Sequence, residues 1–331
     1  MHERLLNIVR RFSERRLLIV GDSIADKFLY GAISRVSREA PVFILRHELT
    51  ETVPGGAANC ALNLAALGAN VSLISVAGND EAGNALREKL SAAGVNVDGL
   101  VLSDRVQTTT KVRILAGHAH ANKQQVIRVD YEDAPLNDSQ LREDLNNSLK
   151  SFLAHADAVI LSDYNYGLVD NQTIELVRDS RRSRNIPVLV DSRFRLSDFS
   201  GLTAATPNED EVEHLIGSPV ESLAQLETAA NRLRQNLKLD ALLVTRGRNG
   251  MMLVTEDPLA LHIPAVGAQA VDGTGAGDTV IAAFALALAS DSSFAEAAQL
   301  ANYAGGLVVM KRGTASITAA ELEQSINDLK P

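Results

Sequence analysis

The residues best suited to chemistry lie in one short stretch, Val271-Asp272-Gly273-Thr274-Gly275-Ala276-Gly277-Asp278-Thr279, ahead of an apolar run at 280–289. Its glycines and its small alanine allow the backbone to turn tightly and to approach a ligand closely. The amides of Gly275, Ala276 and Gly277 are expected to point outward at a helix N-terminus, where the helix dipole also favours negative charge. The stretch therefore predicts an anion hole for a transferring phosphoryl group, with Asp278 beside it.

A simpler interpretation of the same stretch is a glycine-rich turn in which Asp278 caps the following helix. The stretch is not a Walker A loop, because no Gly-Lys-Ser/Thr follows, and it is not a GxGxxG motif in a first strand-to-helix turn. Asp272, Thr274 and Asp278 share one short loop, so the chemical and the structural interpretation both stay open on these residues alone.

The elements that must position this stretch alternate along the chain. Runs typical of buried strands occupy 17–20, 71–77, 158–161, 187–190 and 241–245, and helical patterns occupy 57–67, 82–93 and 222–237. Such alternation predicts an α/β fold with a mostly parallel central sheet flanked by helices. Ligands in such folds bind beyond the carboxyl ends of the strands.

Two segments, 28–53 and 108–131, interrupt this alternation with β-branched runs and no intervening helix. They are predicted to form antiparallel strands that stand off the main sheet as a small β lid over a cleft. Lys111, Arg113 and Arg128 lie in this lid, where basic groups would suit a phosphorylated substrate, although a solvated strand face explains them equally well. No Pro/Ser-rich linker or repeat is visible, so residues 1–331 are predicted to form a single domain.

The bulk composition excludes several classes of protein. The 331 residues are 46% hydrophobic, which is enough for a sizeable core. The formal net charge of −9 leaves no general basic face for nucleic acid, and the longest apolar run, 280–289, is too short to span a bilayer. We therefore expect a cytoplasmic protein without nucleic-acid or membrane partners.

The remaining chemistry-bearing residues have plain interpretations. The single cysteine, Cys60, cannot form an internal disulfide and is expected in the core. His118 and His120 are expected to be exposed in a hairpin loop rather than to bind a metal. The arginine-containing N-terminus is predicted to be a docked amphipathic helix rather than a transit peptide, because Leu5 and Ile8 fall on one helical face.

Four ordered motifs resemble those of the PfkB/ribokinase family of carbohydrate kinases. The stretch at 272–279 is similar to the C-terminal signature of that family, and Gly55-Gly56-Ala57-Ala58-Asn59 is similar to its N-terminal signature. Thr206-Pro207-Asn208-Glu209-Asp210-Glu211 resembles its Asn-x-x-Glu element, and Thr245-Arg246-Gly247, ahead of Gly250, its Thr-x-Gly element. The resemblance spans roughly residues 15 to 325. It implies a ribokinase-like fold and ATP-dependent phosphorylation of a sugar hydroxyl.

Within that family the chain resembles the kinase part of the heptose enzymes of lipopolysaccharide core synthesis, which phosphorylate D-glycero-β-D-manno-heptose 7-phosphate at O1 on the way to ADP-heptose. The stretches that carry this resemblance are Gly21-Asp22, Asp26, Ser37-Arg38-Glu39-Ala40-Pro41-Val42, Pro54-Gly55-Gly56-Ala57-Ala58-Asn59, Leu161-Ser162-Asp163-Tyr164 and Leu243-Val244-Thr245-Arg246. Many of those enzymes also carry a C-terminal nucleotidyltransferase domain with a His-x-Gly-His motif. The chain ends before such a domain, so the stand-alone kinase form is expected.

The sequence differs from the heptose enzymes at one motif, and this difference affects the identity of the acceptor sugar more than the phosphoryl-transfer chemistry. They commonly show Asp-Pro-Lys-Gly after the fourth strand, where this chain has Asp191-Ser192-Arg193-Phe194. Arg193 can supply a positive charge near the phosphates, but arginine and lysine are not equivalent there.

The resemblance implies roles for individual residues. Asp278 is implied as the general base that takes the proton of the sugar hydroxyl, and Gly275, Ala276 and Gly277 as the anion hole. The residues implied to bind the acceptor are Asp22, Asp26, Gly55, Gly56, Asn59, Lys111, Arg113, Arg128 and Asp163. Those implied to bind ATP are Asp191, Arg193, Asn208, Glu211, Thr245, Gly247, Gly250 and Asn302, the last near adenine.

Two cation sites are implied as well. Asn208 and Glu211 would organise Mg²⁺ through water, because magnesium dehydrates reluctantly. Asp272 and Thr274, with nearby carbonyl groups, would hold a monovalent cation such as K⁺. Structural alternatives remain for most of these residues: a plain turn for the 55–56 glycines, a surface cap for Asp26, a helix start for the Asn208 segment, a strand end for the Thr245 segment and a surface helix position for Asn302.

Three functions stay open at this point. The first is a heptose 7-phosphate kinase, and the second is a kinase for another sugar or sugar phosphate. The third is a catalytically silent sensor of sugar or nucleotide, against which the intact Asp278 argues. Because strands of a lid offer an exposed edge, a homodimer formed through the lid is expected.

Overall fold

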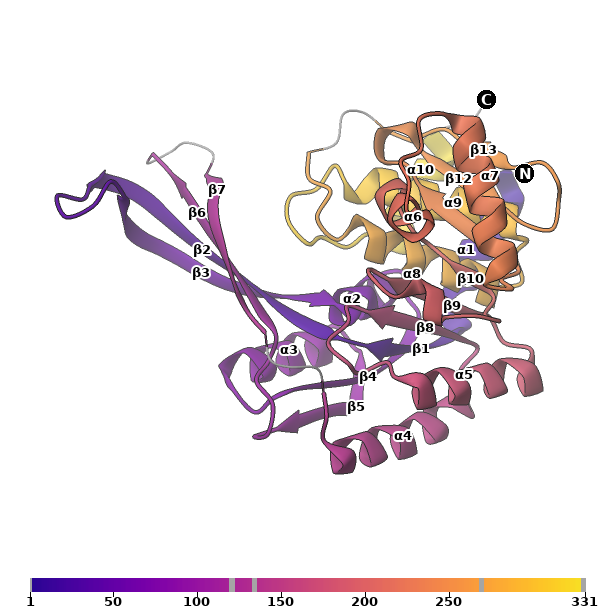
Figure 1. The fold of residues 1–331 in the computed structure, drawn as a ribbon, viewed down its shortest axis with the longest axis horizontal. Helices are drawn as coiled ribbons and strands as arrows, with labels where there is room; N and C mark the ends of the chain where they lie inside the picture. Colours follow the sequence, from indigo (N-terminus) through magenta and orange to yellow (C-terminus); the bar gives the residue numbers. More distant parts are fainter. Residues whose placement is uncertain (1, 119–122, 133–135, 268–270, 329–331) are drawn as a thin grey trace.

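The computed structural model describes residues 2–118, 123–132, 136–267 and 271–328. Within these residues the strands form a nine-stranded central sheet and a separate four-stranded lid sheet (Figure 1). The strands of the central sheet are β1 (Arg16–Gly21), β4 (Asn70–Gly78), β5 (Asn96–Ser103), β8 (Ala158–Asp163), β9 (Val188–Ser192), β10 (Ala204–Ala205), β11 (Ala241–Thr245), β12 (Met251–Val254) and β13 (Leu261–Ile263).

The central sheet has the spatial order β13-β12-β11-β10-β9-β8-β1-β4-β5. The pairings from β5 through to β11 are parallel, and β12 and β13 add an antiparallel edge. The five runs predicted as strands from the sequence correspond to β4, β1, β8, β9 and β11. The predicted mostly parallel sheet is therefore confirmed.

Helices follow most of these strands. They are α1 (His2–Arg10), α2 (Ala57–Ala66), α3 (Glu81–Ala92), α4 (Ser139–Leu153), α5 (Asn171–Arg184), α6 (Glu209–Ile216), α7 (Leu223–Asn236), α8 (Ala276–Ala289), α9 (Phe294–Val308) and α10 (Ala319–Asp328), with short 3₁₀ turns η1 (Phe12–Glu14), η2 (Leu196–Asp198) and η3 (Gly247–Asn249). Of these, α2, α3 and α7 match the three helical patterns predicted from the sequence.

The two faces of the central sheet bury two separate apolar clusters. Successive side chains of a strand point to opposite faces, so Leu17 and Ile19 of β1 join one cluster, whereas Leu18 and Val20 join the other. The first cluster packs against α1, α2, α3, α8, α9 and α10, and the second against α4 to α7. Strands buried on both faces explain why the central strands are continuous apolar runs in the sequence.

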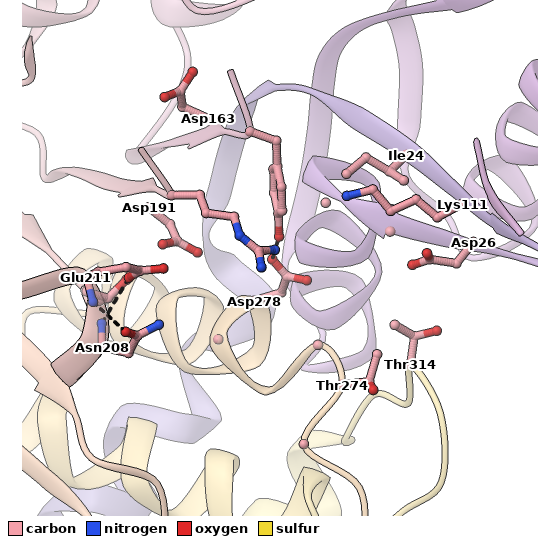
Figure 2. Close-up of a pocket in the computed structure, with 18 of the residues that line it drawn as sticks. Ile24, Asp26, Lys111, Asp163, Asp191, Asn208, Glu211, Thr274, Asp278 and Thr314 are labelled. Carbon is pink, nitrogen blue, oxygen red and sulfur yellow. Dashed lines mark hydrogen bonds between the residues drawn. The ribbon is translucent and has the colours of Figure 1, made fainter. Parts of the chain in front are cut away.

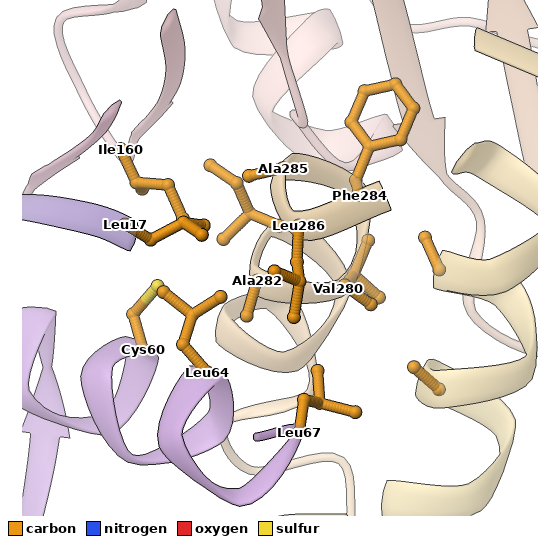
Figure 3. Packing of buried hydrophobic residues seen from close by; sticks show 14 of the residues in the cluster. Leu17, Cys60, Leu64, Leu67, Ile160, Val280, Ala282, Phe284, Ala285 and Leu286 are labelled. Atoms are coloured by element: carbon orange, nitrogen blue, oxygen red, sulfur yellow. The ribbon is translucent and has the colours of Figure 1, made fainter. Parts of the chain in front are cut away.

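Helix α8 is buried on nearly every side. Figure 3 shows its residues Ala282 and Leu286 packed against α2, beside Leu17 of β1 and Ile160 of β8, whereas Val280 faces Gly305 of α9. Cys60 lies in this contact and is fully buried, as expected from the sequence. The packing fixes the first turn of α8 relative to α2, which matters because both helices begin at the candidate site.

The lid sheet contains β2 (Ser23–Val36), β3 (Phe43–Gly56), β6 (Thr110–Gly117) and β7 (Gln124–Tyr131) in the order β3-β2-β6-β7. It projects from the body of the molecule as an arm (Figure 1). The pairs β2–β3 and β6–β7 are antiparallel, but the central pair β2–β6 is parallel, so the expectation of a wholly antiparallel lid was wrong there.

The lid also begins earlier than the predicted residue 28. Only Asp22 separates β1 from β2, so the chain passes directly from the central sheet into the lid. His118 is exposed after β6, as predicted, and His120 lies outside the described residues.

The N-terminal segment forms the predicted docked helix. Leu5, Ile8 and Val9 of α1 are buried in the first cluster. His2 is hydrogen-bonded to Asn327 of α10 at 3.1 Å, and Arg4 pairs with Glu296 of α9 at 3.1 Å. Among the helices in the described part of the chain, none is both apolar enough and long enough to cross a membrane.

Candidate active site

A cavity of about 430 Å³ opens between the lid sheet, the start of α8 and the carboxyl ends of β8, β9, β10 and β11. This is where a parallel α/β sheet is expected to bind ligands. The residues predicted from the sequence that line it are Asp26, Gly55, Gly56, Lys111, Arg113, Arg128, Asp163, Asp191, Arg193, Asn208, Glu211, Thr245, Thr274, Gly275, Gly277 and Asp278.

Asp278 lies near the centre of this cavity, in the first turn of α8 (Figure 2). Its carboxylate accepts a hydrogen bond from Asn59 Nδ2 at 2.7 Å and one from the Tyr164 hydroxyl at 3.3 Å. It makes no capping hydrogen bond to its own helix, so the interpretation of Asp278 as a simple helix cap is wrong. Burial raises the pKa of Asp278 to about 7, although the bonds from Asn59 and Tyr164 favour its charged form.

The turn before α8 holds its backbone close to the neighbouring helix. Gly275 has φ of 77°, and a Cβ at this position would lie only 2.7 Å from Asn59 Nδ2, so glycine is required for both reasons. Among the described residues, the amides of Gly275 and Gly277 have no hydrogen-bond acceptor, whereas the Ala276 amide donates to the Gly273 carbonyl at 3.2 Å. The predicted anion hole is therefore reduced to Gly275 and Gly277, because Ala276 also lies outside the cavity lining.

One end of the cavity is acidic. Asn208 and Glu211 form a capping box at the start of α6, with Glu211 N bonded to Asn208 Oδ1 at 2.8 Å and Asn208 N bonded to Glu211 Oε2 at 3.0 Å (Figure 2). Burial, and then the neighbouring carboxylates of Glu211 and Asp278, raise the pKa of Asp191 well above its usual range. Burial also raises the pKa of Glu211, which Arg193 opposes. A cation would relieve this concentration of negative charge.

The opposite wall is the lid sheet, which contributes both signs of charge. Asp26 of β2 pairs with Arg113 of β6, and the Arg113 guanidinium lies 5.4 Å from the centre of the Phe28 ring. Asp26 is 6% exposed, and a Cβ on Gly55 would lie 2.4 Å from its carboxylate. Asp26 is therefore a buried carboxylate held from two sides rather than a surface cap.

Lys111 stands next to Asp26 across the β2–β6 ladder. Its Nζ lies 5.9 Å from the ring centre of Tyr164 and 5.8 Å from that of Tyr166, so both rings face the ammonium group. Burial lowers the pKa of Lys111, and Asp130 opposes that shift. Arg128 of β7 is held by Asp130 through two bonds, of 2.8 and 3.0 Å.

A second cavity of about 370 Å³ adjoins the first at the lid. Lys111, Arg128, Tyr164 and Arg193 border both cavities. The remaining residues that line the second cavity are Asp130, Glu132, Asn165, Tyr166 and Phe194. Lys111 and Arg128 thus lie at the lid where the two cavities meet, away from the acidic end, and Arg193 reaches the same junction from the end of β9.

Three residues predicted to bind the acceptor direct their side chains elsewhere. Asn59 is 1% exposed and donates to Asp278 instead of facing the cavity. The Asp22 carboxylate accepts the backbone amides of Tyr164, Tyr166 and Leu168, at 2.8, 3.2 and 3.2 Å, and so supports the loop after β8.

Asp163 lines the cavity, but its carboxylate is enclosed. It accepts from the Ser192 hydroxyl at 2.6 Å and from Arg195 Nη2 at 2.7 Å, and its side chain is fully shielded from solvent. The reason is its position at the end of β8, beside the end of β9, where the two neighbouring segments neutralise it. Asp163 therefore has no free carboxylate oxygen that faces the cavity, which is what its predicted role of binding the acceptor directly would need.

On the nucleotide side, only Thr245 of the predicted Thr-x-Gly element lines the cavity. Gly247 and Gly250 lie behind it around η3, where Gly250 permits the close approach of the Ile263 carbonyl. Asn302 is 4% exposed and donates to the Pro264 carbonyl at 2.8 Å, so its interpretation as a surface helix position is wrong. Its placement near adenine stays a prediction.

The predicted monovalent-cation residues connect two loops. The Asp272 carboxylate accepts from Thr274 N and from Gly313 N, both at 2.9 Å. The Thr314 hydroxyl is buried at the edge of the cavity with no hydrogen-bond partner among the described residues. A buried hydroxyl oxygen without such a partner, one residue after the Gly313 amide that bonds Asp272, fits a hard cation. The described residues contain no group of three or more His, Cys, Asp or Glu side chains suited to a metal, so Mg²⁺ would depend mainly on water and phosphate oxygens.

Sequence reasoning missed several residues that line the cavity, namely Ile24, Tyr164, Thr206, Gly273 and Thr314. Tyr164 was detectable, because it directly follows a strand whose carboxyl end meets the site. Thr314 was not, because it lies in a loop after α9 that carries no pattern of its own.

Comparison with known sequences places this geometry in context. A family model described as pfkB family carbohydrate kinase matches residues 20–320. Bifunctional protein HldE of Pseudomonas syringae pv. tomato is 42% identical over 317 residues, a match that covers 96% of this chain and 64% of that relative. The chain thus spans less than two thirds of the length of the curated relatives that it matches.

Two solved structures share the fold. Ribokinase from Arabidopsis thaliana, complexed with ribose and ATP, has a TM-score of 0.74 and 21% identity, with 94% of this chain and 98% of that chain covered. Phosphofructokinase-2 from Escherichia coli, in complex with potassium, has a TM-score of 0.76 and 18% identity, with 95% and 99% covered. The fold predicted from the sequence, ribokinase-like with a β lid, is confirmed.

Proposed function

We propose, from the premise that this chain belongs to the pfkB family of carbohydrate kinases, that it transfers the γ-phosphoryl group of ATP to a hydroxyl of a sugar that already carries a phosphate. The observation that carries this proposal is the buried carboxylate of Asp278 beside the free amides of Gly275 and Gly277. The sugar most strongly supported is D-glycero-β-D-manno-heptose 7-phosphate, with O1 as the acceptor. The resemblance of the motifs and the 42% identity over nearly the whole chain support that choice.

The transfer itself needs positioning and neutralisation of charge more than covalent help. The acceptor oxygen bonds to the γ-phosphorus while the bond from that phosphorus to the β–γ bridging oxygen breaks, and ADP leaves. Asp278 takes the hydroxyl proton, and a base with a pKa of about 7 is matched to that task near neutral pH. The amides of Gly275 and Gly277 stabilise the oxygens of the transferring group.

The nucleotide would approach from the acidic end of the cavity. Asn208, Glu211 and Asp191 would hold Mg²⁺ through water there, and the ion would neutralise the phosphate charge that these carboxylates otherwise repel. Thr245 and Arg193 lie along the same side and would contact the phosphates. ATP is present in the ribokinase structure that shares this fold, which supports the same donor here.

The acceptor would lie between Asp278 and the lid. Asp26 and the backbone at Gly55 and Gly56 would bind its hydroxyls, because carboxylates and amides give directed hydrogen bonds to neighbouring hydroxyls. Its own phosphate would lie in the second cavity, between Lys111 and Arg128. When the phosphate of the acceptor lies at the lid end of the site, the reacting hydroxyl at the other end of the sugar lies near Asp278.

Replacement of the base tests the proposed chemistry. Asp278→Asn keeps the shape of the side chain but cannot accept the proton, so kcat should fall by roughly 10²–10⁴-fold. ADP release with ATP and heptose 7-phosphate is the measurement, and the exposed Asp98→Asn on β5 is the matched control.

Near-normal turnover by Asp278→Asn would remove Asp278 from the role of base. The wild-type protein should be assayed over a panel of sugars and sugar phosphates. ADP release with a different sugar phosphate would change the acceptor but keep the kinase, and release with none of them would favour a sensor.

Replacement of Lys111 in the lid tests where the phosphate of the acceptor binds. Lys111→Met should raise KM for the phosphorylated acceptor by roughly 10–100-fold, because a hydrogen bond to a charged group is lost, while KM for ATP stays constant. Lys27→Met is the control, since Lys27 is a half-buried lid lysine paired with Glu81 at 3.7 Å and lies outside both cavities. A larger effect on KM for ATP than on that for the acceptor would contradict this orientation of the substrates.

A monovalent cation is proposed at Asp272 and Thr274, near the hydroxyl of Thr314. The potassium in the phosphofructokinase-2 structure supports this proposal. The rate in K⁺ should exceed the rate in a bulky organic cation of equal ionic strength, and Thr314→Val should reduce the difference. Equal rates in both salts would rule out the cation.

A homodimer through the lid is proposed from its exposed apolar side chains. Phe43 and Leu49 on edge strand β3 are 60% and 54% exposed, and Val126 and Ile127 on edge strand β7 are 50% and 54% exposed. Monomeric proteins rarely expose such surfaces, and unpaired edges invite pairing with a second copy.

Light scattering should give twice the chain mass of 35.4 kDa for the wild type and a shift toward the monomer for Phe43→Glu. Leu259→Glu, at a position 80% exposed in the turn between β12 and β13, is the control that should stay dimeric. A wild-type protein that is monomeric at micromolar concentration would contradict the dimer.

A further inference from the structure

A chain of buried polar side chains runs behind Asp278 and has no part in the proposed chemistry. The Thr279 hydroxyl lies 2.7 Å from Asn63 Oδ1, and Asn63 Nδ2 lies 2.9 Å from the Asn59 carbonyl oxygen and 3.3 Å from Asn59 Oδ1. Asn59 Nδ2 then contacts Asp278 at 2.7 Å. Asn59, Asn63 and Thr279 are each at most 1% exposed. A polar network this deep between two helices is costly unless every member is satisfied.

Two groups set the direction of each hydrogen bond in this chain: the Asn59 backbone carbonyl, which faces Asn63 Nδ2, and the Thr279 hydroxyl, which gives Asn63 Oδ1 its donor. The Asn59 backbone carbonyl can only accept, so the Asn63 group that faces it must be the NH₂. Asn63 therefore presents its oxygen to Thr279, whose hydroxyl must donate. If the Thr279 hydroxyl donated to the Gly275 carbonyl at 3.4 Å instead, the Thr279 and Asn63 side-chain oxygens would face each other at 2.7 Å without a hydrogen between them.

The orientation of the Asn59 side chain next to Asp278 is fixed in the same way. Because the Asn63 NH₂ also faces the Asn59 side chain, that side chain must present its oxygen to Asn63 and its NH₂ to Asp278. The reverse orientation of Asn59 would place two NH₂ groups against each other. The carboxylate thus receives a donor whose orientation is set by residues that contact neither the cavity nor a substrate.

We propose that Thr279 and Asn63 are positioning residues that hold Asn59 as an obligatory donor to Asp278 and thereby keep the proposed base charged and aimed at the acceptor. The inference rests on the proposed function, in which Asp278 is the base. Without the fixed donor, Asn59 could rotate and its side-chain oxygen could accept a hydrogen bond from a neutral Asp278, which would make the protonated, inactive form more stable. Burial already favours that form, so the donor opposes it.

The charged and titratable groups around Asp278 are not members of the relay. They come from every element packed against it: Cys60 of α2, Tyr164 after β8, Asp191 and Arg193 at the end of β9, and Asp26 of β2. None of these is hydrogen-bonded to Thr279 or Asn63 in the described part of the chain. A substitution at Thr279 therefore removes no hydrogen bond from any of these charged or titratable groups.

The test is the pH profile of kcat for Thr279→Val, which removes the donor but keeps the shape of the side chain. The acidic limb should move up by about one pH unit, because Asn63 Oδ1 loses its donor, Asn63 can then turn, and Asn59 no longer has to donate its hydrogen bond to the Asp278 carboxylate. For a base that titrates near pH 7, kcat at pH 7 should then fall about fivefold and recover at about pH 9. KM for ATP should not change.

Two further variants and a control complete the comparison. Thr279→Ser keeps the hydroxyl and should restore the wild-type limb, and Asn63→Leu interrupts the relay one step nearer the base and should reproduce the shift. Thr228→Val is the control, because Thr228 bonds the Ala224 carbonyl at 2.8 Å on the exposed side of α7. A kcat lowered equally at every pH, with an unmoved limb, would overturn the relay and leave only a packing defect.

A measurement without turnover separates the relay from the proposed function. The carboxyl infrared band of Asp278, obtained as the difference between wild type and Asp278→Asn, should titrate near pH 7 and shift upward in Thr279→Val. If the wild type shows no Asp278 band that titrates between about pH 5 and pH 9, that result would contradict the role of Asp278 as the base. A wild-type titration that Thr279→Val leaves unchanged would count against the relay only.

Discussion

The close contact between the N-terminal turns of α2 and α8 is the constraint on which the site depends. The apolar faces of the two helices meet below it and fix their separation (Figure 3). At the top of the contact the Gly275 backbone touches the Asn59 amide, and no side chain would fit between them. This approach buries the Asp278 carboxylate and supplies its donor at the same time. A larger separation of the helices would leave the carboxylate solvated, with an ordinary pKa and no fixed direction.

The charges in the cavity are separated in a way that suits the two phosphorylated substrates of the proposed reaction. The end near α6 carries Asp191 and Glu211, whereas the end near the lid carries Lys111 and Arg128. A bare triphosphate would be repelled at the acidic end, so in the proposed reaction the nucleotide would need a cation that neutralises both it and the wall. The phosphate of the proposed acceptor would find cationic partners at the lid. Asp278 lies between the two ends, as the proposed transfer between these substrates requires (Figure 2).

The sequence predicted the parts of this arrangement that depend on local pattern. Apolar strands buried on both faces, the glycines before α8 and the motif order were each visible in single stretches of chain. It did not predict that Asn59 serves the base instead of the substrate, because that contact joins residues 219 positions apart. Nor did it predict that Asp163 is neutralised by Arg195, since carboxylates at strand ends look alike until the neighbouring loops are placed. The parallel β2–β6 pair was missed for the same reason.

The short connection between β1 and β2 links the lid to the base. Asp22, the single residue between these strands, holds the amides of Tyr164, Tyr166 and Leu168. Tyr164 in turn reaches Asp278, and Tyr166 bonds Glu132 just after β7 of the lid. The loop after β8 is thus tied to the central sheet, the lid and α8 at once. The proposed site for the acceptor's phosphate and the environment of Asp278 are therefore connected through this one loop.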